Sequence, residues 1–248
     1  MKLLYMLTAA AVLQLQPAPG VRSLFLIGDS TMAERADTSI TAERGWGQML
    51  QRFFDDSVHV RDFAVNGRSS KSFIAEGKWA AAVSRMHAGD YVIIQFGHND
   101  EKIDDSTRYT NPYTGYRRNL LRFIAESRGK GAIPIVFSPI VRRKFNEHGV
   151  LVDTHGPYPL VARDVARETG APFVDLQLMT EDLVAAKGPE DSKALYVWFS
   201  PGQSALYPQG HQDDTHLSTV GAIAVAELAA RGLKQTVLSL ARHIRPFN

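Results

Sequence analysis

The chain of 248 residues contains no cysteine, carries a net charge of only +2 and has no apolar run long enough to span a bilayer. The absence of cysteine excludes disulfide bonds, a thiolate nucleophile and cysteine-ligated zinc. The small net charge argues against nucleic acid as a partner, although an acidic polymer remains compatible with it. The apolar run at residues 3–15 is shorter than the ~20 residues of a transmembrane helix, so we expect no stable membrane insertion.

The N-terminal segment has the layout of a short secretory signal. Lys2 precedes the apolar run at 3–15, and Gln-Pro-Ala-Pro-Gly follows at 16–20. We therefore predict a signal peptide at residues 1–20 and a secreted or periplasmic protein. The alternative is an N-terminal extension of a cytoplasmic protein. No Pro/Gly/Ser-rich linker divides the remainder, which predicts a single catalytic domain over residues 21–248.

Short β-rich runs alternate with helical patterns along the rest of the chain. Strands are expected at residues 24–28, 58–65, 91–96, 132–137 and 172–174, and helices at 45–54, 79–87, 113–128, 161–169 and 217–231. The strands are nearly continuous apolar runs, which is typical of a parallel sheet covered on both faces. The pattern predicts a three-layer α/β/α sandwich around a central parallel sheet.

Ser30 follows the first expected strand, which runs from apolar residues into Gly-Asp-Ser-Thr at 28–31. Open α/β sheets place their ligands at the carboxyl ends of the strands, so this hydroxyl has a position that suits a nucleophile. Serine needs a base to remove its proton, and residues 213–216 (Asp-Asp-Thr-His) offer the His216 imidazole with a carboxylate before it. The pattern indicates a serine hydrolase.

Two other expected strands end in groups that could stabilise an oxyanion. Asn-Gly follows one strand at residues 66–67, and Gly-His-Asn-Asp follows another at 97–100. If these strands are parallel neighbours, their ends converge on one crevice. Acyl transfer builds negative charge on the carbonyl oxygen, and we assign its donors as the backbone N–H groups of Ser30 and Gly67 and the side chain of Asn99.

Each motif also has an ordinary structural alternative. Gly-Asp-Ser-Thr and Asn-Gly are common turn sequences, and Asn99 or Asp213 could simply cap a helix. The motifs nevertheless agree with one another, because each lies where a strand ends or a helix begins and one catalytic arrangement explains them all.

A metal site is a second alternative. Residues 211–216 contain two imidazoles and two carboxylates, a composition that could supply a zinc ion with protein ligands. A metal mechanism would leave Ser30, Gly67 and Asn99 without a role, so we expect neither a metal nor an organic cofactor. We expect His211 to lie in a loop. Asp214 is the alternative carboxylate for orienting His216, although we expect it to make structural hydrogen bonds instead.

Taken together, the motifs resemble the SGNH subgroup of the GDSL esterase/lipase family, whose four namesake residues fall on Ser30, Gly67, Asn99 and His216. Residues 106–113 and 210–218 are similar to segments of its rhamnogalacturonan acetylesterases. The resemblance covers about residues 23–232. It implies a flavodoxin-like fold, a Ser30–His216–Asp213 triad and removal of acetyl groups from pectic polysaccharide. The first motif reads Gly-Asp-Ser-Thr rather than Gly-Asp-Ser-Leu, a variation that also occurs among the acetylesterases.

Residues that could bind the sugar are less distinct in the sequence. Six basic residues near strand ends could pair with galacturonate carboxylates: Arg68, Lys71, Arg108, Arg142, Arg143 and Lys144. Tyr196, Trp198 and Tyr207 could form an apolar platform against sugar faces. Solvated surface or core packing explains any one of them equally well, so the substrate-binding residues stay unassigned.

We therefore predict a serine esterase that removes O-acetyl groups from acetylated pectic polysaccharide or oligosaccharide through an acetyl-serine intermediate. The nearest alternatives are an acetylesterase for another polysaccharide such as xylan and a general short-chain esterase or lipase. The alternative of a different class is a non-catalytic carbohydrate-binding protein. Binding alone requires no activated nucleophile, so the intact Ser30, Asn99, Asp213 and His216 argue against it. The sequence leaves the oligomeric state open.

Overall fold

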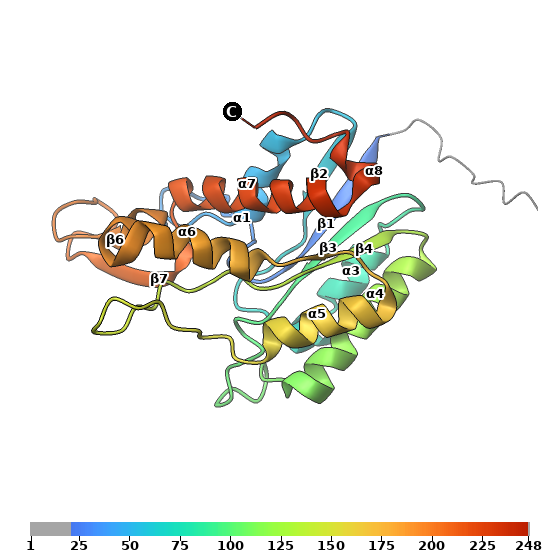
Figure 1. Ribbon diagram of the computed structural model, residues 1–248, viewed down its shortest axis with the longest axis horizontal. Helices are drawn as coiled ribbons and strands as arrows, with labels where there is room; N and C mark the ends of the chain where they lie inside the picture. Colours follow the sequence, from blue (N-terminus) through green and yellow to red (C-terminus); the bar gives the residue numbers. More distant parts are fainter. Residues whose placement is uncertain (1–20, 248) are drawn as a thin grey trace, which may run out of the picture.

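The computed structural model describes residues 21–247, and the predicted signal peptide lies outside these residues. A central sheet contains five parallel strands in the order β2-β1-β3-β4-β5 (Figure 1). The strands are β1 (Arg22–Gly28), β2 (Val58–Asp62), β3 (Tyr91–Gln95), β4 (Ile133–Phe137) and β5 (Phe173–Val174). This strand order is that of flavodoxin-like proteins, so the predicted fold class is confirmed.

Both faces of the sheet are buried, because alternate residues of each strand point to opposite sides. Leu24 and Leu26 pack on one side, and Phe25 and Ile27 on the other. The first side is covered by α1 (Trp46–Leu50), α6 (Leu176–Asp191) and α7 (Thr219–Thr236), with α8 (Leu238–Ala241) at its edge. The second is covered by α2 (Ser70–Ala75), α3 (Lys78–Val83), α4 (Arg117–Gly129) and α5 (Tyr158–Thr169). Figure 1 shows the resulting three layers.

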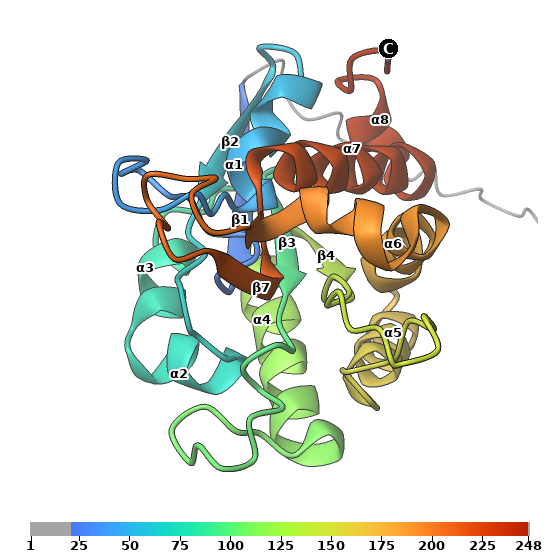
Figure 2. The ribbon, with the colours of Figure 1, turned by 90° about the vertical axis from the view of Figure 1, so that its left-hand side faces the viewer.

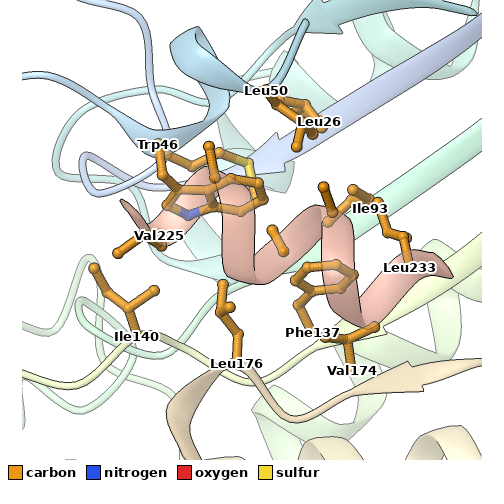
Figure 3. Close-up of a cluster of buried hydrophobic side chains, with 14 of the residues drawn as sticks. Leu26, Trp46, Leu50, Ile93, Phe137, Ile140, Val174, Leu176, Val225 and Leu233 are labelled. Atoms are coloured by element: carbon orange, nitrogen blue, oxygen red, sulfur yellow. The ribbon is translucent and has the colours of Figure 1, made fainter. Parts of the chain in front are cut away.

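Trp46 of α1 is buried in the core between the first layer of helices and the sheet. Its indole ring stacks on Phe137 with a centroid separation of 5.9 Å and an interplanar angle of 7° (Figure 3). The indole N–H donates to Gln95 Oε1 at 3.0 Å, so the buried polar group is satisfied. This packing fixes α1 against the carboxyl ends of β3 and β4.

Several elements begin or end at different residues from those expected. The helix expected at 45–54 is α1 followed by a 3-10 turn, η1 (Gln51–Phe53), and a π-helical turn, η2 (Pro112–Tyr116), leads into α4. Another 3-10 turn, η3 (Ser192–Leu195), follows α6. Within residues 21–247, no helix combines the length and apolar character needed to cross a membrane.

An antiparallel hairpin lies outside the central sheet and was not expected. It consists of β6 (Tyr196–Phe199) and β7 (His211–Leu217). The helix expected from residue 217 therefore starts later, at Thr219, where Ser218 Oγ accepts the backbone N–H of Gly221 at 3.1 Å. The loop position expected for His211 is also wrong, since this residue pairs with Phe199 at the start of β7.

Candidate active site

The sheet order brings the carboxyl ends of β1, β2 and β3 together at one end of the sheet, the end that faces the viewer in Figure 2. Strand β1 pairs with β2 on one side and β3 on the other, so the turns after all three strands are neighbours. Ser30 lies in the turn after β1. Asp29 shapes this turn, since its carboxylate accepts the backbone N–H and the hydroxyl of Thr31 at 2.9 Å each.

Ser30, His216 and Asp213 form a continuous hydrogen-bonded chain. Ser30 Oγ lies 2.9 Å from Nε2 of His216, and Nδ1 of the same ring lies 2.8 Å from Oδ2 of Asp213. The other carboxylate oxygen of Asp213 accepts backbone N–H groups of Thr215 and His216 at 2.7 and 2.9 Å. The structure thus joins a hydroxyl, an imidazole and a carboxylate in the order that nucleophile activation requires.

The surroundings of Asp213 and His216 favour an ionised carboxylate beside a basic imidazole. Burial opposes ionisation of Asp213, but hydrogen bonds from His216 and Thr215 outweigh it and lower its pKa to about 2. Burial also opposes charge on His216, yet its hydrogen bond to Asp213 and the nearby carboxylates raise its pKa above the usual value. The imidazole is therefore a stronger base than a free histidine.

Glu43 is a second carboxylate at His216 that the sequence analysis missed. Its Oε1 lies 3.9 Å from Nδ1 of His216. Its Oε2 is paired with Arg35 at 2.6 Å, and the Arg35 guanidinium, only 8% exposed, also donates to the backbone oxygen of Ser30 at 3.3 Å. This ion pair therefore contacts both the backbone of Ser30 and the imidazole of His216.

The predicted oxyanion donors lie on the two turns that flank Ser30. Asn99 is 3% exposed and its Nδ2 donates to the backbone oxygen of Arg68 at 3.2 Å, while Arg108 Nη1 donates to its Oδ1 at 3.4 Å. These contacts fix the orientation of the amide and leave one of its N–H groups for another acceptor. Gly67 adopts a φ of +71°, a conformation that favours glycine.

A buried polar network lies next to the turn that carries Ser30. Oδ2 of Asp29 is 3.4 Å from Nδ1 of His98, whose ring packs edge-on against His155 with centroids 4.5 Å apart. His155 in turn contacts Glu101 at 2.8 Å, and Glu101 pairs with Arg142. Burial lowers the pKa of His98 to about 4, so this imidazole is neutral at neutral pH. The network ties the loops after β3 and β4 to the residue before Ser30.

Most of the basic residues considered as sugar ligands have internal partners. Arg68 pairs with Glu76 at 2.8 Å, Arg108 with Asp105 at 2.5 Å and Arg143 with Asp214 at 2.5 Å, while Arg142 pairs with Glu101. Lys71 donates to the backbone oxygen of Ser106 at 2.6 Å. Of the aromatic candidates, Tyr196 is buried and donates to the backbone oxygen of Val141. These residues therefore have structural roles within the fold.

The four residues of the alternative zinc site do not all point to one position. Asp214 turns toward Arg143 and Trp198, with contacts of 2.5 and 2.8 Å, rather than toward His216. Among residues 21–247, one set of side chains has the spacing that could hold a metal ion. The potential ligand atoms of Glu43, Asp213 and His216 lie within 4.8 Å of one another. Each ring nitrogen of His216 already has a hydrogen-bond partner, which suits proton transfer better than metal ligation.

Comparison with known proteins identifies the family to which this arrangement belongs. The model of the GDSL-like lipase/acylhydrolase family matches residues 26–222, a segment that begins in β1 and ends in α7. The chain belongs to this family. It is accordingly a carboxylic ester hydrolase, and the family match spans Ser30, Gly67, Asn99 and His216.

Two curated relatives of the chain are both named rhamnogalacturonan acetylesterase. Over 221 residues the chain is 40% identical to rhamnogalacturonan acetylesterase RhgT of Bacillus subtilis, covering 89% of this chain and 93% of RhgT. Over 238 residues it is 28% identical to the rhamnogalacturonan acetylesterase of Emericella nidulans, covering 88% and 87% of the two chains.

Solved structures share the fold of this family member. The crystal structure of YxiM from Bacillus subtilis superposes with a TM-score of 0.71 at 27% identity, over 86% of this chain and 56% of that chain. The acetylxylan esterase Axe2 of Geobacillus stearothermophilus gives a TM-score of 0.62 at 19% identity, over 86% and 94% of the two chains. The likeness to Axe2 is one of fold alone.

Proposed function

We propose that this protein removes O-acetyl groups from acetylated rhamnogalacturonan, with Ser30 as nucleophile, His216 as general base and Asp213 as the residue that orients it. The observation that carries the proposal is the unbroken hydrogen-bond chain through these three side chains. The 40% identity to RhgT over nearly the whole of both chains supports a pectic substrate.

The first half of the reaction acylates Ser30. Nε2 of His216 takes the proton from Ser30 Oγ as this oxygen attacks the acetyl carbonyl carbon. Asp213 accepts a hydrogen bond from the Nδ1–H of His216 throughout and stays ionised. The ring therefore keeps the tautomer that presents the Nε2 lone pair to the serine, and its cation is stabilised. The imidazolium then donates its Nε2 proton to the sugar oxygen as the bond from this oxygen to the acetyl carbon breaks. The sugar leaves with a free hydroxyl, and an acetyl-serine remains.

The oxyanion receives hydrogen bonds from groups that are already in place. The N–H groups of Ser30 and Gly67 and the free N–H of the Asn99 amide are assigned to it. Arg108 acts as a positioning residue, because it holds the Oδ1 side of that amide. Water deprotonated by His216 attacks the acetyl-serine in the second half, releasing acetate and restoring the serine.

Acetate release from two polymers tests the reaction and the substrate together. Wild-type protein is incubated with acetylated rhamnogalacturonan and with acetylated xylan, beside the variants Ser30→Ala and Ser84→Ala. Ser84 is an exposed serine at the end of α3 and serves as the matched control. We expect rapid release from the pectic polymer alone, lost only in Ser30→Ala. Equal release from both polymers would support esterase activity but contradict the specificity for the pectic polymer.

A fluorophosphonate probe separates an enzyme from a non-catalytic sugar-binding protein. An activated serine reacts covalently with this probe, whereas an ordinary hydroxyl does not. We expect labelling of wild type and Ser84→Ala and none of Ser30→Ala. Folded wild-type protein that fails to react would favour the binding protein.

We also propose that the protein is exported and that residues 1–20 are its signal peptide. Support comes from the order of Lys2, the apolar run and the short Pro/Ala/Gly segment. Expression of the full chain with N-terminal sequencing of the product tests this. A mature protein that starts near residue 21 outside the cytoplasm is expected, and an intact Met1 in the cytoplasm would contradict export.

A further inference from the structure

A hollow of about 810 Å³ lies at the loop end of the β6–β7 hairpin, and the hydrogen-bonded chain at Ser30 does not use it. Its lining includes Lys193, His211 and three exposed glutamines, Gln203, Gln209 and Gln212, and it contains no aspartate or glutamate. Carboxamides donate and accept hydrogen bonds, as sugar hydroxyls do. A cation among them adds a preference for a carboxylate.

Lys193 is held at this hollow by the indole of Trp198. Its Nζ lies 4.9 Å from the ring centroid, and the guanidinium of Arg143 lies 4.5 Å from the same ring. The indole N–H donates to Asp214 Oδ1 at 2.8 Å, which fixes the ring. Because two cations already contact the indole, Trp198 supports Lys193 by a cation–π contact rather than offering a free platform to a sugar.

One acidic side chain competes for the Lys193 ammonium. Glu190 accepts from Nζ at 2.7 and 2.9 Å, but its side chain is 79% exposed. An exposed pair of this kind is weak, and the ammonium has three donors, so a ligand carboxylate can share it. Loss of Glu190 should therefore strengthen binding of an acidic ligand, and loss of Lys193 should weaken it.

The hollow adjoins the strand that carries the catalytic residues. His211 lines it, and Nε2 of His211 lies 3.9 Å from Oδ2 of Asp213. Gln212 precedes His216 by four residues on β7, which places their backbones at most about 14 Å apart. An oligosaccharide reaches across this distance, whereas a single acetylated sugar does not.

We propose that this hollow is a subsite for an acidic sugar residue of the same polysaccharide chain whose acetyl ester lies at Ser30. Lys193 pairs with the sugar carboxylate, and Gln209 and Gln212 bind its hydroxyls. The inference rests on the proposed function, since it supplies the specificity of that same active site for a uronate-containing polymer.

Two substitutions with opposite expected effects test the subsite. Binding of rhamnogalacturonan oligosaccharides is measured by titration calorimetry in the Ser30→Ala background, where the ligand is not consumed. Lys193→Gln should raise Kd about two- to fivefold, and Glu190→Gln should lower it by a similar factor. Lys234→Gln is the matched control, because Lys234 also lies over an aromatic ring, 5.3 Å from Phe247, but outside the hairpin. This control should leave Kd unchanged.

A carboxyl-reduced form of the same oligosaccharides shows whether charge is the cause. With this neutral ligand, we expect neither Lys193→Gln nor Glu190→Gln to change Kd. Unchanged binding of the charged ligand, or equal shifts with both ligands, would overturn the subsite. Far-ultraviolet circular dichroism and thermal unfolding of each variant should match those of the Ser30→Ala parent, which verifies folding. Absence of acetate release from the polymer by wild type would refute the proposed function, whereas release with unaltered variant binding would refute the subsite alone.

Discussion

Glu43 places its Oε1 3.9 Å from Nδ1 of His216, the same nitrogen that contacts Asp213 at 2.8 Å. Arg35 holds the other oxygen of Glu43, so this carboxylate faces the imidazole without displacing Asp213. Its negative charge adds to that of Asp213 in favouring the imidazolium. Two acidic residues from opposite ends of the chain therefore favour the charged form of His216.

Glu43→Gln should move the pH dependence of the esterase to lower pH. The neutral imidazole is the form that accepts the serine proton, so kcat/KM rises as pH increases through the pKa of His216. Removing a carboxylate lowers this pKa, and the rising limb moves with it. A pH–rate profile on p-nitrophenyl acetate measures the effect. Glu227→Gln, which removes a half-buried carboxylate paired with Arg231, is the control, and equal profiles for the two variants would contradict the role of Glu43.

Asp213→Asn should reduce kcat on the order of 10⁴-fold, because an amide no longer fixes the productive tautomer of His216. The neighbouring Asp214→Asn is the control, since its carboxylate contacts Arg143 and Trp198 instead. We expect Asp214→Asn to retain kcat within a fewfold of wild type and to lower Tm. Steady-state kinetics and thermal unfolding check both variants. A larger loss of kcat in Asp214→Asn than in Asp213→Asn would show that Asp214, and not Asp213, orients His216.

Asn99→Ala should lower kcat by about 10²- to 10³-fold with a smaller effect on KM, because an oxyanion donor acts mainly in the transition state. Arg108→Met should lower kcat less, since Arg108 acts through the orientation of the Asn99 amide. The double variant should resemble Asn99→Ala alone, because no amide remains to be oriented. Multiplied effects in the double variant would show that Arg108 acts independently.

Gly221→Ala should lower the free energy of unfolding by at least about 1 kcal/mol. A Cβ at this position in α7 would lie 1.8 Å from the backbone oxygen of Leu195, so the helix or η3 must shift. Gly129→Ala in α4 is the control, as its Cβ meets no atom within 4 Å. Denaturant unfolding of both variants measures the difference. Equal stability of the two would show that the contact is readily relieved.

The central sheet could be predicted because its strands are buried on both sides. All five residues of β3 are buried, and the sequence shows them as one nearly continuous apolar run. Parallel strands also end on one edge, which is why Ser30, Gly67 and Asn99 could be placed together from their positions after strands. Family resemblance, rather than spacing, selected Asp213 over Asp214.

Elements without a clear apolar pattern were missed. β7 reads His-Gln-Asp-Asp-Thr-His-Leu and forms through pairing with β6, so its polar sequence carries no strand signal. In α6 only Leu176, Thr180 and Val184 are buried, a single narrow row, and Gly188 and Pro189 interrupt its end. Glu43 and Arg35 lie in a segment without helix or strand, and their contacts depend on the fold as a whole.

Ser30 and His216, the proposed nucleophile and base, are held by different sheets. Ser30 follows β1 of the central sheet, and His216 lies on the β6–β7 hairpin. The hydrogen bond between Ser30 and His216 therefore depends on the packing of the hairpin against the rest of the molecule. Heat or denaturant that loosens the hairpin separates base from nucleophile while the five-stranded sheet is still intact. Enzymatic activity should then disappear at a lower temperature than the far-ultraviolet circular dichroism of the central sheet, and a ligand that bridges hairpin and sheet should bring the two transitions together.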